Sequence, residues 1–171
     1  MFALRCTQKL LKRMKTPLVD EPARSTTLLG DWYANLVFVG RQQLVLCCCE
    51  NTYLPIVIEA RDIDGLVPRL NIALLEVLAS LGVPDAAIDD ELALMTDAVV
   101  AKTTSKVVLG VMNEYGYSMS GGRHTNLVQL SLWLAHTPLF AGKSKETLWP
   151  DDATRAAFAA PRVPRGLHLV H

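Results

Sequence analysis

The stretch Gly30-Asp31-Trp32-Tyr33-Ala34-Asn35-Leu36-Val37-Phe38-Val39 predicts a turn that opens into a β-strand. Two later runs, residues 43–49 and 53–59, are also rich in Val, Ile, Leu and aromatic side chains, and short turn segments separate the three runs. This spacing predicts an antiparallel β-meander with residues 33–39 at its hub. Pro55 predicts an edge position for the third strand, because proline donates no backbone hydrogen bond.

Helical patterns dominate the second half of the chain. Leucines recur at helical spacing over residues 66–81, with Pro68 in the first turn and Asp62 or Asp64 available as the cap. A second amphipathic segment follows from residue 84 onward. These two segments predict a helical hairpin.

Shorter segments complete the expected fold. Residues 127–135 are apolar nearly all round, which predicts a buried helix. The remaining expected elements are strands at 2–6, 26–29 and 98–102 and helices at 8–15, 107–117 and 151–158. The sequence therefore predicts an α+β fold, in which an antiparallel β-meander packs against a helical hairpin and a buried C-terminal helix.

The totals favour one folded domain. The chain has 171 residues, 50% of them hydrophobic and 20% charged, and this composition argues against disorder. We expect a single α+β domain over residues 1–158 and a mobile tail over 159–171, where Pro161 and Pro164 occur. No apolar run reaches the length of a membrane span, so we expect a cytoplasmic protein with no membrane partner.

Neither cysteine spacing nor histidine spacing indicates a metal site. The four cysteines are Cys6 and the run 47–49, without a C-x-x-C pair, and we expect them to pack as small hydrophobic side chains. This usage fits a reducing compartment. No phosphate-binding loop or nucleophile motif is present, so we expect no metal and no cofactor.

A basic segment lies near the N-terminus. Thr7 is a candidate cap for the helix predicted over residues 8–15, on which Lys9, Lys12 and Arg13 share one face. A solvated helix face is the favoured interpretation, and the alternative is a contact surface for an acidic protein partner or RNA. The net charge of zero does not indicate a large nucleic-acid-binding surface.

Asp31, Trp32 and Asn35 are candidate ligand-binding residues at the start of the hub strand. A carboxylate, an indole and an amide there suit a polar ligand or a stacked base, whereas the alternative is a structural turn. Strand alternation places Trp32 and Ala34 on one face and Tyr33 and Asn35 on the other.

A second group of candidates, Lys102, Thr103 and Asn113, flanks the N-terminus expected for the helix at 107–117, and the run Thr103-Thr104-Ser105 offers a cap for that helix. A helix N-terminus attracts anions because its first N–H groups have no partner within the helix. Gly110 within that helix suggests a close approach of another backbone.

Four segments together resemble an uncharacterised bacterial family known as a domain of unknown function. They are Leu4-Arg5-Cys6-Thr7-Gln8-Lys9-Leu10, Gly30-Asp31-Trp32-Tyr33-Ala34-Asn35, Lys102-Thr103 with Leu109-Gly110-x-Met112-Asn113, and Leu130-Ser131-Leu132-x-Leu134-Ala135-x-Thr137-Pro138. The likeness spans about residues 3 to 158. An asparagine–arginine pair is expected after Lys102-Thr103, and Thr104-Ser105-Lys106 stands there instead. The resemblance implies a bacterial, cytoplasmic protein of one domain, and it implies no activity.

Two functions are compatible with these residues. The first is a non-enzymatic binding or accessory module, whose ligand site lies where the start of the hub strand meets the helix near Lys102 and Asn113. The alternative is a small toxin-type ribonuclease, with Asp31 as base and Lys9 or Lys102 stabilising the phosphate charge.

Overall fold

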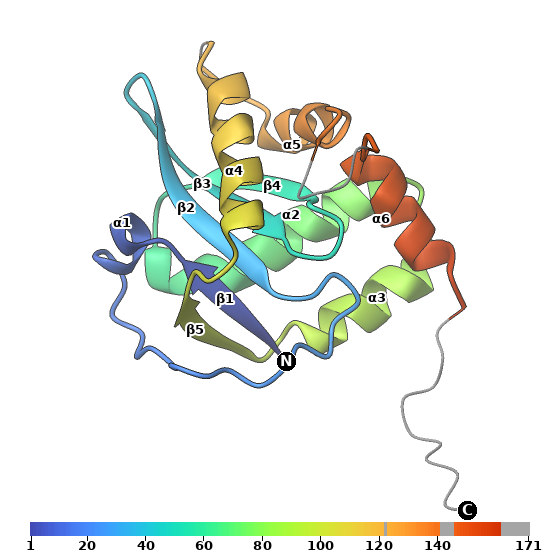
Figure 1. Cartoon of the computed structure of the whole chain (residues 1–171), viewed down its shortest axis with the longest axis horizontal. Helices are drawn as coiled ribbons and strands as arrows, with labels where there is room; N and C mark the ends of the chain where they lie inside the picture. Colours follow the sequence, from blue (N-terminus) through green and yellow to red (C-terminus); the bar gives the residue numbers. More distant parts are fainter. Residues whose placement is uncertain (122, 141–145, 162–171) are drawn as a thin grey trace, which may run out of the picture.

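The fold is built on one five-stranded sheet with the strand order β4-β3-β2-β1-β5. A computed structural model describes residues 1–121, 123–140 and 146–161 (Figure 1). The strands are β1 (Phe2–Cys6), β2 (Trp32–Val39), β3 (Gln42–Cys49), β4 (Pro55–Glu59) and β5 (Ala98–Lys102). The helices are α1 (Gln8–Leu11), α2 (Leu66–Ser80), α3 (Asp85–Leu94), α4 (Lys106–Met119), α5 (Leu127–Ala135) and α6 (Pro150–Ala159), with a short 3-10 helix at Ile63–Gly65.

The sheet is mixed, which corrects the expectation of an antiparallel meander alone. Strands β2, β3 and β4 do form the predicted antiparallel meander, and β4 with Pro55 lies at the sheet edge as expected. Strand β1, however, runs parallel to both β2 and β5 and lies between them. Periodicity gives the face of each side chain but not the direction of the neighbouring strand, so the parallel half was not predictable from it.

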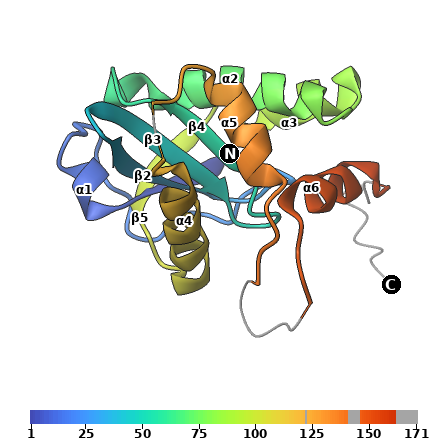
Figure 2. The same cartoon turned by 90° about the horizontal axis from the view of Figure 1, so that it is seen from above.

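Helices cover both faces of the sheet (Figure 2). The helical hairpin of α2 and α3 covers the face that carries Trp32 and Ala34, while α4 covers the face that carries Tyr33. The predicted alternation along β2 is thus confirmed. The predicted fold class omitted α4 as a covering element, because strand pattern alone does not show that the second face is also buried.

Helix α5 covers the outer edge of β4 but is not buried all round. The hydroxyl of Ser131 accepts a hydrogen bond from the Val57 amide at 2.9 Å, so the helix occupies an edge donor of the sheet. Leu130 and Leu134 are buried, whereas Trp133 is 57% exposed. The expectation of a fully buried helix is therefore correct for one side of α5 only.

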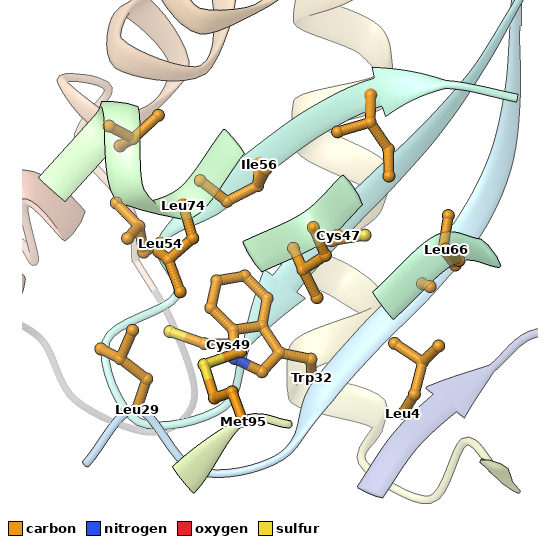
Figure 3. Close-up of a cluster of buried hydrophobic side chains, with 14 of the residues drawn as sticks. Leu4, Leu29, Trp32, Cys47, Cys49, Leu54, Ile56, Leu66, Leu74 and Met95 are labelled. Atoms are coloured by element: carbon orange, nitrogen blue, oxygen red, sulfur yellow. The ribbon is translucent and has the colours of Figure 1, made fainter. Parts of the chain in front are cut away.

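The Trp32 indole is the largest side chain of the core beneath α2 (Figure 3). It is 0% exposed, and Leu29, Cys49 and Met95 lie around it. Its Nε1 has no hydrogen-bond partner among the described residues. The cysteines pack as expected, and loss of hydration raises the pKa of Cys6 to about 12 and that of Cys48 well above its usual value. Their thiols therefore stay protonated.

The capping of two helices differs from the prediction, and so does the end of one of them. Helix α1 ends at Leu11 instead of residue 15, and Thr7 makes no capping bond because its hydroxyl donates to Asn35 Oδ1 at 2.7 Å. Neither Asp62 nor Asp64 caps α2; Asp64 accepts a hydrogen bond from the Lys15 amide at 2.9 Å. Both cases show a polar side chain that is recruited by a distant backbone or side chain instead of the local helix.

Most of the other local expectations are confirmed, and one is wrong. Pro68 lies in the first turn of α2, and Ser105 caps α4 by accepting a hydrogen bond from the Val108 amide at 3.2 Å. Residues 26–29 do not form a strand: the amides of Leu28 and Leu29 donate to the buried carboxylate of Glu91. Helix α6, Pro150–Ala159, matches the helix predicted at 151–158 and includes Ala159, the first residue of the tail expected over 159–171; residues 162–171 of that tail lie outside the described residues.

No helix in the described part of the chain is long and apolar enough to cross a membrane.

The expected close approach of another backbone at Gly110 is wrong, because a Cβ added there meets no atom within 4 Å. At Gly30, by contrast, neighbouring side chains leave no room for a Cβ. It has a φ of +81°, and an added Cβ would lie 2.6 Å from Glu50 Cγ.

These two glycines predict opposite effects on stability. Gly110→Ala should raise the free energy of unfolding by about 1 kcal/mol, because alanine favours an exposed helix position. Gly30→Ala should lower it by at least about 1 kcal/mol, because a left-handed conformation disfavours a Cβ. Urea unfolding followed by circular dichroism measures both changes, and equal signs for the two variants would contradict the described packing.

Candidate functional site

A groove of about 560 Å³ runs between strand β2 and helix α4. Its walls combine aliphatic and aromatic side chains with an ammonium, amides and hydroxyls, and ligand sites commonly combine apolar walls with polar groups. The groove is lined by Lys9, Asn35, Leu36, Val37, Phe38, Met112, Asn113, Gly116, Tyr117 and Ser120.

The β2 side of the groove carries two of the predicted site residues. Asn35 is held in place because its side-chain oxygen accepts a hydrogen bond from the Thr7 hydroxyl at 2.7 Å. The ammonium of Lys9 lies 4.6 Å from the centre of the Phe38 ring, and the Arg13 guanidinium lies 5.8 Å from it. Phe38 thus orients two cations beside the groove.

The α4 side of the groove contributes Asn113, Gly116 and Tyr117. These positions are three and four residues apart, so they share one face of the helix. Asn113 lies in the middle of α4 and not near its first turn, which corrects the expectation that it flanks a helix N-terminus. The Tyr117 ring is 82% exposed and forms part of the outer rim.

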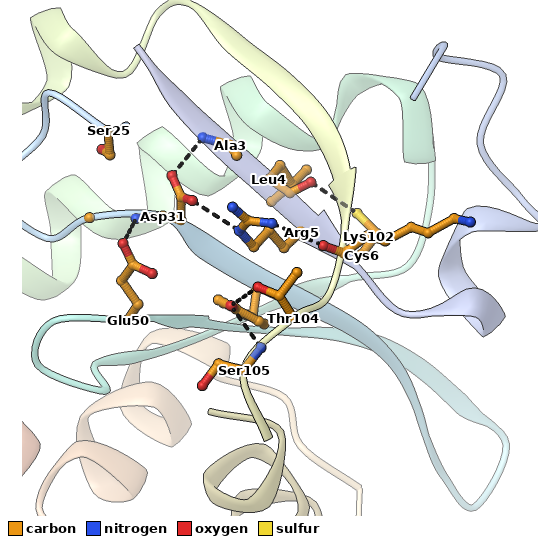
Figure 4. A network of polar contacts seen from close by, with 12 residues as sticks. Ala3, Leu4, Arg5, Cys6, Ser25, Asp31, Glu50, Lys102, Thr104 and Ser105 are labelled. Carbon is orange, nitrogen blue, oxygen red and sulfur yellow. Dashed lines mark hydrogen bonds and ion pairs between the residues drawn. The ribbon is translucent and has the colours of Figure 1, made fainter. Parts of the chain in front are cut away.

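Asp31 and Trp32 lie outside the groove and serve the fold. The Asp31 carboxylate accepts hydrogen bonds from the Ala3 amide and from Arg5 Nε, both at 2.9 Å (Figure 4). The Asp31 amide donates to Glu50 Oε1 at 3.0 Å. This carboxylate therefore joins β1 to the start of β2, and Trp32 is enclosed in the core.

Lys102 and Thr103 also lie apart from the groove, at the end of β5. The Lys102 carbonyl accepts a hydrogen bond from Arg5 Nη1 at 3.2 Å (Figure 4). The neighbouring residues Thr104 and Ser105 both contact the hydroxyl of Tyr33 at 3.2 Å. Of the seven predicted site residues, the groove brings together Lys9, Asn35 and Asn113, and it does not include the other four.

Sequence reasoning missed several lining residues. Phe38, Met112, Gly116 and Tyr117 line the groove but were assigned to strand or helix packing. A usable signal was the mismatch in strand length: β1 has five residues and β2 has eight. A short strand beside a long one leaves part of the long strand uncovered.

The lining of the groove carries few kinds of polar group. The groove contains one ammonium, side-chain amides and hydroxyls, but none of its lining residues is a carboxylate, histidine or cysteine. Lys9 and Tyr117 are the lining side chains that can gain or lose a proton. In the described part of the chain, no group of three or more His, Cys, Asp or Glu side chains is arranged to hold a metal ion.

The fold and groove define a mixed-sheet α+β protein with a candidate binding surface beside its central strand. Residues 3–153 match the model of a family described as "Domain of unknown function (DUF6933)". The chain belongs to this family, which confirms the resemblance to a family known as a domain of unknown function. No match was found among curated proteins or among solved structures.

The position of Asp31 predicts a structural role that is separable from binding. Asp31→Ala leaves the Arg5 guanidinium and the Ala3 amide without their partner, and we expect the free energy of unfolding to fall by about 3 kcal/mol. In an Arg5→Met background the same substitution should cost less, because no buried cation is left unpaired. Chemical denaturation of the four proteins measures this coupling, and additive effects would contradict the pairing.

Proposed function

We propose that this protein is a non-enzymatic binding or accessory module of the bacterial cytoplasm, and that its ligand site is the groove between β2 and α4. The observation that carries the proposal is the groove itself, in which Lys9, Asn35 and Asn113 project among apolar walls. Binding sites commonly combine such walls with a few polar groups that orient the ligand.

The site is prearranged for binding on its β2 side. Thr7 fixes the amide of Asn35, and the Phe38 ring lies against the ammonium of Lys9. Side chains that are already ordered lose less conformational entropy when a ligand binds. The cations at Lys9 and Arg13, with Lys12 next to them in sequence, favour a partner that carries negative charge.

The toxin-type ribonuclease receives less support. Its proposed base, Asp31, has both carboxylate oxygens engaged by Ala3 and Arg5, and it does not line the groove with Lys9. A general base must reach the proton that it abstracts. Lys102 lies at the end of β5, again apart from Lys9 and Asn35 in the groove.

A groove-filling variant tests the proposal. Gly116→Trp places an indole in the groove, whereas Gly110→Trp places the same side chain on an exposed part of the same helix. An added Cβ meets no atom within 4 Å at either position, so both variants should fold. We would measure the melting temperature of each protein with collections of metabolites, peptides and oligonucleotides.

We expect at least one compound to raise the melting temperature of the unaltered protein and of Gly110→Trp, but not that of Gly116→Trp. Asn35→Ala and Lys9→Ala should reduce the same shift. Purified protein should also leave RNA intact. Cleavage of RNA that is lost in Asp31→Asn, or compounds that stabilise Gly116→Trp as well as the unaltered protein, would contradict the proposal.

A further inference from the structure

The outer half of strand β2 has one edge along which no strand of the described chain pairs. Strand β3 pairs with β2 over its whole length, from Trp32 to Val39. On the other side, the pairing with β1 ends where Cys6 lies opposite Ala34. In Figure 1 the β2–β3 hairpin extends well past the end of β1.

The backbone groups on this side belong to Leu36 and Phe38. The Thr7 amide donates to the Ala34 carbonyl at 3.1 Å, so Ala34 directs its backbone groups toward β1 and away from β3. In an antiparallel pair this direction alternates with every residue. Leu36 and Phe38 therefore direct an N–H and a C=O each toward the unpaired side, which we call the open edge.

Helix α1 is the reason that β1 does not continue along the open edge. The carbonyl that a longer β1 would offer to the Leu36 amide is that of Thr7. This carbonyl instead accepts hydrogen bonds from the amides of Leu10 and Leu11, at 3.0 and 2.9 Å, in the first turn of α1. The chain thus turns away and leaves the donors and acceptors of the open edge without a strand partner.

The groove reaches this backbone at Phe38, which is 45% exposed, whereas Leu36 is only 2% exposed, so its edge groups become available when an entering segment moves the covering atoms aside. The side chain of Leu36 lies in the core on the opposite face of the sheet from α4, yet Leu36 lines the groove beside α4. Its contribution to the lining therefore comes from its backbone. An extended segment lying in the groove would meet the open edge on one side and Asn113 and Tyr117 on the other.

Positively charged side chains flank the open edge. Lys9 and Arg13 lie beside Phe38, at the outer end of the open edge, and Arg13 also donates a hydrogen bond to Gln43 Oε1 at 2.7 Å. At the hairpin end a second hollow of about 570 Å³ contains Arg41 and Arg123 and shares Ser120 with the groove. Its wall is firmly held, because the Gln42 side chain exchanges two hydrogen bonds with the backbone of His124.

We propose that the open edge of β2 binds an extended, acidic segment of a protein partner by strand addition, in line with β1. This inference rests on the proposed function and names the class of its ligand. Backbone hydrogen bonds to Phe38, and to Leu36 once the covering atoms have moved, supply affinity, and acidic side chains meet the flanking cations. A second copy of the chain fits poorly, because pairing two open edges would bring both sets of cations together.

The test uses a display library of random linear peptides, selected on the unaltered protein and counter-selected on Gly116→Trp. We expect the selected peptides to be acidic and rich in β-branched or aromatic residues. A synthetic copy should lose at least about tenfold in affinity when alternate backbone amides are N-methylated, and little when the intervening amides are. This two-residue period is specific to strand addition.

Two protein variants test the backbone and the charge contributions to binding, and a third variant is the control. Phe38→Pro removes one donor from the open edge, a position where proline is tolerated, and should weaken the peptide by about tenfold with the fold retained by circular dichroism. Lys9→Glu with Arg13→Glu should weaken acidic peptides and strengthen basic ones. Reversal of charge at exposed Lys106, at the start of α4, should change the affinity for neither acidic nor basic peptides.

Several outcomes would overturn the inference. Selected peptides whose binding is insensitive to the N-methylation pattern would do so, as would a dimer of this chain that Phe38→Pro dissociates. A metabolite or oligonucleotide that needs the groove, with no peptide that does, would end the strand-addition proposal and leave the proposed function standing. If no compound of any kind depends on the groove, both fail.

Discussion

The parallel pairing of β1 with β2 ends at Cys6 and Ala34, and this limit divides β2 into an enclosed part and an uncovered part. Inside the limit, β2 is enclosed by strands on both sides and by helices on both faces. Beyond it, β2 keeps one strand neighbour, and the groove beside α4 follows this uncovered part. The limit arises because the chain enters α1 directly after β1, so the Thr7 carbonyl is taken by a helical turn.

The polar residues at the start of β2 hold the parallel half of the sheet together. The Asp31 carboxylate contacts the backbone of β1 at Ala3 and the side chain of Arg5, which in turn reaches the end of β5. A buried carboxylate is stable when such partners neutralise its charge and fill its hydrogen-bonding capacity. Trp32, directly after it, fills the core on the α2 face. The unusual residue content of this stretch thus serves packing, while the candidate binding groups lie further along the same strand.

Local patterns in the sequence predicted the elements well and their assembly in part. Alternation along β2, the edge position of Pro55 and the Ser105 cap all follow from neighbouring residues, and the structure confirms them. The parallel position of β1 depends on a partner 28 residues along the chain, as in the bond from Ala3 to Asp31. Asn35 and Asn113 meet across the groove for the same long-range reason. Side-chain type identified three groove residues, whereas the open backbone edge has no side-chain signature.

Amide hydrogen exchange of the free protein tests the open edge most directly. Asn35 and Val37 direct their N–H groups toward β3, so their amides should be strongly protected. The Leu36 and Phe38 amides, between and beside them on the same strand, should exchange much faster. Such alternation of protection with a two-residue period is the expected result. Equal protection of all four amides, whether it arises from pairing or from burial, would show that this side of β2 is closed to solvent, and it would contradict the account.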